Sequence, residues 1–271
     1  MGKAEWFNPS GSVKDRAALN IIRTAELDGE LNPGMTILDS TSGNMGIALA
    51  MLGAARGYHV KLTIPENASQ ERIAILRAYG AELIFMDPLE GSDGAQLEAQ
   101  RLAASTDRDT FYANQYNNPA NWSAHYYTTA NEIWNQTAGQ VTHFIAGAGT
   151  SGTLVGTTRR LKELNPEIIS ASMQPDGPFH GLEGLKHISS SITPGIYDPA
   201  AADQELLVNT EDAYQMAKKI ARVEGLFLGI SAAAAVVAGI QLGRQLDQAV
   251  VVTVLPDNGF KYLSERFWNE G

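Results

Sequence analysis

A lysine stands at the start of the first predicted helix. Residues 8–16 have the sequence NPSGSVKDR, and Ser12 can cap a helix that begins near residue 13, which puts Lys14 in its first turn. The positive end of a helix dipole disfavours a cation, so we expect a lowered pKa and a more nucleophilic amine at Lys14. A lysine that forms a Schiff base needs both properties. The alternative is an ordinary solvated lysine beside Asp15, and this segment alone favours that alternative.

Two loops that follow predicted strands are rich in glycine and small polar residues. Residues 39–46 have the sequence DSTSGNMG, and residues 147–153 have the sequence GAGTSGT. Ligands of open α/β sheets bind beyond the carboxyl ends of strands, where backbone N–H groups at a helix start can hold an anion. The second loop also fits the G-x-G-x-x-G pattern of dinucleotide sites, with Asp176 near the place of a ribose-binding acid. The alternatives are an ordinary helix cap for the first loop and a tight glycine turn for the second.

Short β-rich runs alternate with helical patterns along the chain. The strand-like runs are residues 35–38, 59–64, 82–85, 142–146, 168–173 and 250–255. Apolar residues recur at helical spacing in residues 13–28, 69–79 and 212–224. This alternation predicts an α/β fold in which helices connect parallel strands. The region 175–203 is irregular and rich in Pro, Gly, Ser and His, so we expect it to be a functional loop.

Composition excludes several classes of function. The 271 residues suffice for two domains, 44 % are apolar, and the formal net charge is −10 with no basic stripe, which disfavours binding to nucleic acid or to an anionic membrane. The chain has no cysteine, and its five histidines lack the spacing of metal ligands, so we expect no metal site. Residues 1–10 are mixed and polar, and no apolar run reaches the ~18 residues of a membrane span. These features predict a cytoplasmic protein.

The three segments, taken together and in this order, resemble the cysteine synthase and cystathionine β-synthase family, whose members are fold-type II enzymes that use pyridoxal 5′-phosphate (PLP). Further matches are QYNNPAN at residues 115–121, the run 125–134, GIS at residues 229–231 and PD at residues 256–257. The resemblance covers nearly the whole chain. It implies two domains, each a mostly parallel twisted sheet flanked by helices, which we divide at 1–118 and 119–271. It also implies a homodimer, and an N-terminal part that is shorter than usual before Lys3.

The resemblance implies a role for each matching residue. Lys14 would hold PLP as a Schiff base and, once released, remove the α-proton of the substrate. Asn44 would bind the ring hydroxyl of the cofactor, and Ser231 would meet its pyridine nitrogen. The phosphate would lie among the residues of the second loop, which are Gly149, Thr150, Ser151, Gly152 and Thr153. The substrate carboxylate would be held by Thr41, Ser42 and Gln115.

One branch of the family matches best. Residues 181–187 (GLEGLKH) and 193–198 (TPGIYD) look like the cysteine synthase B and O-phosphoserine sulfhydrylase branch. Members of that branch often carry an arginine near the position of Lys186, where a cation suits a charged leaving group or nucleophile such as phosphate or thiosulfate. The alternative places Lys186 on a mobile, solvated loop.

The implied reaction is a β-replacement that forms L-cysteine from an activated serine, O-acetylserine or O-phosphoserine, and a sulfur donor such as sulfide or thiosulfate. Cystathionine formation and serine or threonine dehydration share the same cofactor frame and stay open. A member with impaired activity is a further alternative, because Met45 stands where the family usually has threonine. The last alternative is a nicotinamide-dependent dehydrogenase built on residues 147–152.

Overall fold

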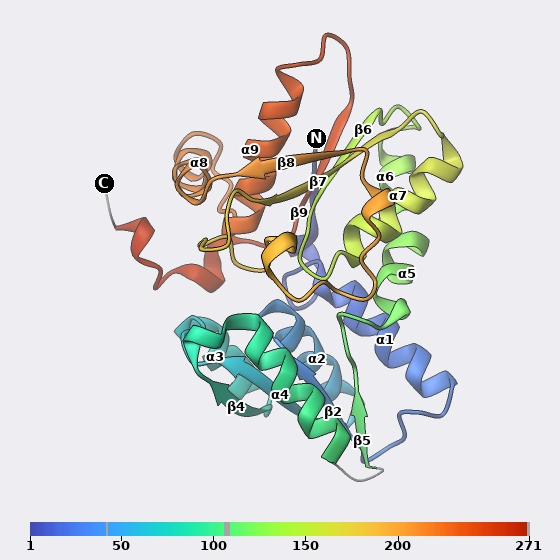
Figure 1. Ribbon diagram of the computed structural model, residues 1–271, viewed down its shortest axis with the longest axis vertical. Coiled ribbons are helices and arrows are strands. Elements are labelled where there is room, and N and C mark those ends of the chain that lie inside the picture. Colours follow the sequence, from blue (N-terminus) through green and yellow to red (C-terminus); the bar gives the residue numbers. More distant parts are fainter. Residues whose placement is uncertain (42, 106–108, 270–271) are drawn as a thin grey trace.

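Two parallel β-sheets form two lobes of the molecule (Figure 1). The computed structural model describes residues 1–41, 43–105 and 109–269. The five-stranded sheet has the order β1-β9-β6-β7-β8, and its strands are β1 (Gly2–Ala4), β6 (His143–Gly147), β7 (Ile169–Pro175), β8 (Gln204–Val208) and β9 (Val251–Leu255). The four-stranded sheet has the order β4-β3-β2-β5, and its strands are β2 (Thr36–Ser40), β3 (His59–Pro65), β4 (Glu82–Met86) and β5 (Thr110–Tyr112). Neighbouring strands pair in parallel throughout both sheets, which confirms the predicted fold class.

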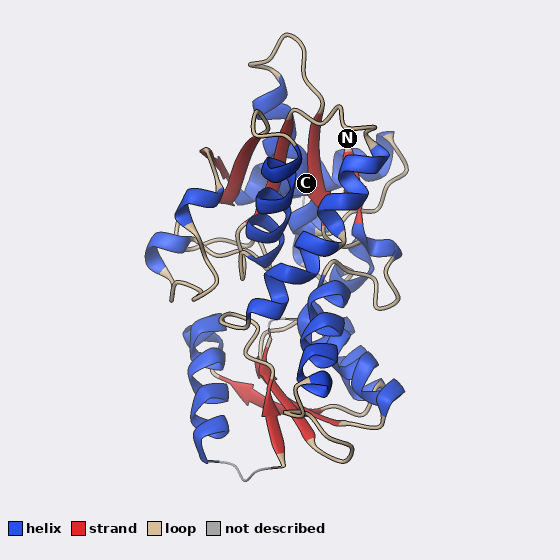
Figure 2. Cartoon of the chain, turned by 90° about the vertical axis from the view of Figure 1, so that its right-hand side faces the viewer, coloured by secondary structure: helices blue, strands red, loops and turns tan. Residues whose placement is uncertain are grey.

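Helices cover both sheets, as the view in Figure 2 shows for the four-stranded sheet in the lower half of the picture. They are α1 (Lys14–Leu27), α2 (Asn44–Arg56), α3 (Gln70–Ala78), α4 (Gly91–Ser105), α5 (Pro119–Tyr127), α6 (Thr129–Gln136), α7 (Gly152–Leu164), α8 (Thr210–Val223) and α9 (Ile230–Gly243). The three helices expected from apolar spacing lie within two residues of α1, α3 and α8. Across the described ranges, no helix combines the length and the apolar character that crossing a membrane requires.

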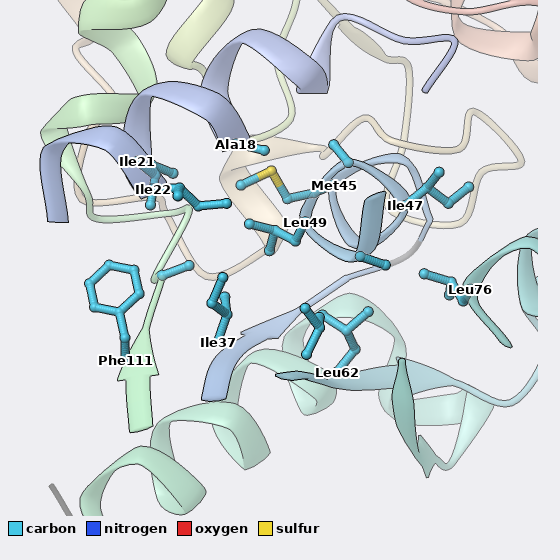
Figure 3. Packing of buried hydrophobic residues seen from close by; sticks show 14 of the residues in the cluster. Ala18, Ile21, Ile22, Ile37, Met45, Ile47, Leu49, Leu62, Leu76 and Phe111 are labelled. Carbon is cyan, nitrogen blue, oxygen red and sulfur yellow. The ribbon is translucent and has the colours of Figure 1, made fainter. Parts of the chain in front are cut away.

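Helix α2 packs between α1 and the four-stranded sheet, and this packing fixes where it begins. Its side chains Met45 and Leu49 lie against Ile22 of α1, and Ile37 and Leu62 of the sheet lie beneath them (Figure 3). The helix is apolar on nearly every side because protein surrounds it. Burial of these side chains therefore holds the N-terminus of α2 at the carboxyl end of β2.

The two lobes do not correspond to two continuous segments of the chain. The boundary expected between residues 118 and 119 falls between β5 and α5, but β1 pairs with β9 in the five-stranded sheet. In Figure 1 the N-terminus accordingly lies in the upper lobe beside β9. We keep 1–118 and 119–271 as a proposed division of the domains, with the first strand assigned to the C-terminal sheet.

The irregular region predicted at residues 175–203 contains two short 3-10 turns, Ile188–Ser190 and Pro199–Ala201, between β7 and β8. It runs across to the other lobe, where Lys186 contacts Asp93 at the start of α4. In Figure 1 this segment (yellow to amber) accordingly lies over α4. The loop therefore brings residues of the two lobes together.

Candidate active site

A cavity of about 750 Å³ lies between residues of the two lobes, a volume typical of small-molecule sites. Ten of the residues named from the sequence line it, namely Lys14, Thr41, Asn44, Gln115, Gly149, Thr150, Ser151, Thr153, Lys186 and Ser231. Gly152 is buried next to Asn121 and does not itself line the cavity. Ser42 lies outside the described residues. The structure thus brings together side chains that are up to 217 positions apart in the chain.

Lys14 is the first residue of α1, and its backbone N–H donates to the Ser12 hydroxyl at 3.3 Å. Its side chain lines the cavity between the lobes. Burial lowers the pKa of the Lys14 amine to about 8, because the surrounding protein disfavours the charged form. The sequence predicted a lowered pKa from the helix dipole, whereas the dominant cause in the structure is loss of solvent. A sizeable fraction of the amine is therefore neutral, and able to act as a nucleophile or a base, near neutral pH.

The loop before α7 forms a cradle for an anion. Within the described part of the chain, the backbone N–H groups of Gly149, Thr150 and Ser151 have no hydrogen-bond acceptor. They lie at the positive end of a 13-residue helix, where such groups bind phosphates and carboxylates. Ser151 has the left-handed φ of +70°, a strained conformation that often marks a functional site. A Cβ atom on Gly149 would lie 2.3 Å from the carbonyl oxygen of Gly184, so this close approach requires glycine.

A buried histidine supports the same loop. The Thr153 hydroxyl lies 3.3 Å from Nε2 of His125, and Nδ1 of that ring lies 2.9 Å from the Thr129 hydroxyl. Burial lowers the pKa of His125 to about 3, so the ring is neutral. Its two nitrogens therefore hold two threonine hydroxyls in place. The sequence pattern gave no sign of this contact, because His125 and Thr153 lie on different helices, α5 and α7.

The Asn44 amide is fixed from both ends. Its Nδ2 donates to the Asp257 carboxylate at 2.7 Å, and its Oδ1 accepts from Nζ of Lys261 at 2.8 Å. The Tyr262 hydroxyl donates to the same Asp257 oxygen at 2.7 Å. The donor at Oδ1 settles the orientation of the amide, and one Nδ2 proton is left to point elsewhere. Lys261 and Tyr262 thus belong to the surroundings of the site, although the sequence predicted no role for them.

The loop before α2 combines helix capping with a possible binding role. The Thr41 hydroxyl oxygen accepts the backbone N–H groups of Gly43 at 2.9 Å and Gly46 at 3.0 Å, so it satisfies an N–H group of the first turn of α2, although the N-cap residue itself is Gly43 and not an ordinary Ser, Thr or Asn cap. Its hydroxyl proton is still available as a donor. Gln115 donates from Nε2 to the Ser40 carbonyl at 2.6 Å and keeps a second Nε2 proton. Both side chains can therefore donate to a carboxylate in the cavity.

Four ionised side chains form what we call the charged wall of the cavity: Arg72, Asp93, Glu183 and Lys186. Lys186 is only 4 % exposed and forms an ion pair with Asp93, so the solvated alternative for Lys186 is wrong. Arg72, on α3, forms an ion pair with Glu183 and lies over the Tyr262 ring. The position of Arg72 on the buried face of its helix, four residues before Leu76, was a usable signal in the sequence. Asp93 offered none, because its partner lies 93 residues away.

Comparison with known proteins agrees with this geometry. A family model described as pyridoxal-phosphate dependent enzyme matches residues 1–257. The chain belongs to this family. It is 52 % identical over 272 residues to a cysteine synthase of Aquifex aeolicus, and this alignment covers 99 % of this chain and 83 % of the relative. It is 42 % identical to cysteine synthase B of Salmonella typhimurium, and that alignment covers 99 % of this chain and 88 % of the relative.

Solved structures give the same result. The fold matches that of a cysteine synthase from Entamoeba histolytica with a TM-score of 0.92 and 37 % identity, covering all of this chain and 82 % of that one. It also matches an O-ureido-L-serine synthase with a TM-score of 0.92 and 38 % identity, covering 99 % of this chain and 87 % of that one. The dehydrogenase alternative is therefore wrong. Asp176, its ribose-binding candidate, instead accepts a hydrogen bond from Asn209 at 2.8 Å.

The residues that line the cavity fit PLP, which carries an aldehyde, a phosphate, a ring hydroxyl and a ring nitrogen. Lys14 places an amine in the cavity, which is the group that the aldehyde requires, and the unengaged N–H groups before α7 suit the phosphate. The buried Ser151 hydroxyl oxygen has no partner among the described residues, which is the state expected of a group that awaits a ligand. Ser231, in the first turn of α9, brings a further hydroxyl to the cavity.

Proposed function

We propose that this chain is a cysteine synthase, which forms L-cysteine by replacing the β-substituent of an activated serine with a sulfur donor. One observation carries the proposal: a lysine amine with a pKa of about 8 and an anion-binding helix N-terminus line the same cavity. The relatives named cysteine synthase, which match 99 % of this chain, support that reaction among those that the fold allows.

Lys14 has two tasks in this proposal. It would hold the cofactor covalently, and as a free amine it would take the proton from Cα of the substrate. Its lowered pKa suits both, because each requires the neutral amine. Bound PLP supplies an electron sink that makes the Cα proton acidic. Asn44 would donate its remaining Nδ2 proton to the ring hydroxyl, and the residues of the second loop, Gly149 to Thr153, would hold the phosphate.

The other cavity residues would orient the substrate. Thr41 and Gln115 would donate to its carboxylate, as their available protons allow, and Ser42 would assist them. Ser231 would meet the ring nitrogen. A neutral hydroxyl cannot protonate that nitrogen as an aspartic acid would, so Ser231 would favour prompt loss of the β-substituent. Lys186 would lie near the leaving group, on the charged wall.

The experiment is an assay of the purified, PLP-loaded protein with an activated serine and sulfide, with cysteine as the detected product. We expect cysteine from the unchanged protein and none above background from Lys14→Ala. Lys219→Ala, on the exposed face of α8, serves as the matched control and should keep full activity. Pyruvate without cysteine would indicate β-elimination without replacement, pyruvate from serine itself would indicate a dehydratase, and product only with homocysteine would indicate cystathionine formation. Retention of a covalent PLP link by Lys14→Ala would refute the assignment of Lys14.

We further propose a homodimer in the cytoplasm, which rests on the family resemblance and on the acidic, cysteine-free composition. Light scattering of the PLP-loaded protein should give twice the mass of the 29.1 kDa chain. Fractionation of the source cells should place the activity in the cytosolic fraction. A monomer that is fully active would contradict the first expectation.

A further inference from the structure

The charged wall contains a cation that already has an anionic partner. Lys186 is 4 % exposed, its ammonium group forms an ion pair with Asp93, and its Nζ lies 5.0 Å from the centre of the Tyr116 ring. The neighbouring Gln115 is a candidate for binding the substrate carboxylate. The ammonium group is thus close to where the substrate would lie, but its charge is balanced by the protein itself.

The pair joins the two lobes. Asp93 lies in the first turn of α4, and its second carboxylate oxygen accepts the backbone N–H of Ile192 at 2.8 Å. Lys186 lies in the loop between β7 and β8, and its own backbone N–H donates to the Ala148 carbonyl beside the anion cradle. Asp93 is therefore held beside Lys186 by two contacts to the loop, one to Lys186 itself and one to Ile192.

The other charges around the cavity do not favour an additional anion. Apart from Lys14, the described cations that line it are Arg72 and Lys186, and each forms an ion pair with a carboxylate. The described carboxylates that line it are Glu90, Asp93, Glu183 and Glu265. His180 also lines it, and burial lowers the pKa of that ring, which favours the neutral form. The field that a substrate side chain meets is therefore net negative.

We propose that Asp93 is a specificity-determining residue, which neutralises Lys186 and so makes the site select an activated serine with an uncharged β-substituent over one with a phosphate. This inference rests on the proposed function and narrows its substrate class. A phosphate group would have to displace Asp93 from Lys186, and this would leave a carboxylate without its counter-ion in a cavity that three other acidic side chains line. An acetyl group has no charge and leaves the pair intact. The charged leaving group that the family branch suggests is thus disfavoured in this chain.

The experiment compares kcat/KM for O-phosphoserine and O-acetylserine, with sulfide as the second substrate, in the PLP-loaded protein. The unchanged protein should prefer O-acetylserine by about tenfold or more, and Asp93→Asn should raise the ratio of O-phosphoserine to O-acetylserine by about tenfold or more. The asparagine keeps the size of the side chain and an oxygen for the Ile192 N–H. Asp93→Ser is measured in parallel, so that misfolding of one variant leaves the other to decide.

Two controls separate the ion pair from the general field. Glu90→Gln removes one negative charge from an exposed residue that lines the same cavity and should change the ratio by less than about twofold. The double variant Asp93→Asn with Lys186→Met should lose the gain of the single variant, because the freed cation is gone.

A binding measurement does not depend on turnover. Sulfate is titrated calorimetrically into the PLP-loaded protein, in which the cofactor occupies the anion cradle. Asp93→Asn should bind sulfate about tenfold more tightly than the unchanged protein, and the double variant should not. If neither activated serine yields cysteine, the proposed function fails, and this titration still decides on Asp93. Three results would each overturn the inference. They are a preference of the unchanged protein for O-phosphoserine, a substrate ratio in Asp93→Asn that equals that of the unchanged protein, and a change of this ratio in Glu90→Gln that is as large as in Asp93→Asn.

Discussion

Asp39 is a buried carboxylic acid whose charge should destabilise the protein above neutral pH. It lies in β2, directly before the loop that carries Thr41 and Asn44, and it is completely buried. Neither of its oxygens has a hydrogen-bond partner of good geometry among the described residues. Burial raises the pKa of Asp39 from 3.8 to about 7, and the nearby N–H groups of Ser40 and Gln115 oppose this shift only in part.

The sign and the size of the effect follow from that pKa. Between pH 3.8 and about 7 the folded protein keeps a proton that the unfolded chain has lost, so the stability falls as the pH rises through this window and is constant above it. Each pH unit is worth about 1.4 kcal/mol, so about 3 kcal/mol should be lost between pH 5 and pH 8. Asp39→Asn removes the charge and keeps the shape. The variant lacks this loss, so between pH 5 and pH 8 its free energy of unfolding should rise by about 3 kcal/mol relative to that of the unchanged protein.

The assay is thermal unfolding of both proteins at pH 5, 6, 7 and 8. For a chain of this size 1 kcal/mol corresponds to about 2 °C or more, so the difference in Tm should grow by about 5 °C or more. Asp203→Asn is the control without a pH dependence in this range, because hydrogen bonds from Lys162 and Ser170 hold the pKa of Asp203 below its usual value of 3.8. The Asp203 carboxyl is ionised in the folded and the unfolded protein from pH 5 to pH 8, so its loss should lower the stability equally at all four pH values. The reasoning would be refuted if Asp39→Asn and the unchanged protein differed in Tm by the same amount at pH 5 and at pH 8.

Three further predictions test the site and the core. The rate at which the PLP-free protein binds PLP covalently should rise as the pH is raised through about 8, because the neutral Lys14 amine is the form that reacts. Stopped-flow absorbance measures this rate, and a pH dependence with its midpoint near 10.5 would contradict the prediction. Gly149→Ala should weaken PLP binding by about tenfold or more in a fluorescence titration, because the added Cβ atom clashes with the Gly184 carbonyl oxygen. An unchanged affinity would show that the loop moves to accommodate the Cβ atom. Phe144→Ala should lower the free energy of unfolding by about 3–5 kcal/mol, because the ring is fully buried between the helices and the five-stranded sheet. Thermal unfolding should show this as a Tm lower by about 6 °C or more. A loss of stability below about 1 kcal/mol would show that the surrounding core collapses into the space that the ring leaves.

Local pattern was sufficient for much of the fold. Apolar periodicity located α1, α3 and α8, and apolar β-rich runs located β2, β3, β4, β6, β7 and β9. Of these strands, all but the partly exposed β4 are largely buried, which is why their sequences are almost continuously apolar or β-branched. The strands β1, β5 and β8 were missed. Two of them have three residues, and β8 lies at a sheet edge with alternate residues exposed, so none gives a strong apolar signal.

The order of three motifs in the sequence determined the family, and with it the residues that we propose as the cofactor lysine and the anion loop. Those motifs are local, because a helix start and a glycine turn are encoded by neighbouring residues. The surroundings of the site were decided only by the tertiary structure. The Asn44 amide is oriented by Asp257 and Lys261, and Lys186 is neutralised by Asp93, through contacts between residues that are 93 to 217 positions apart. Such pairs leave no period in the chain, because the charge that a side chain meets depends on which distant segment the fold lays beside it.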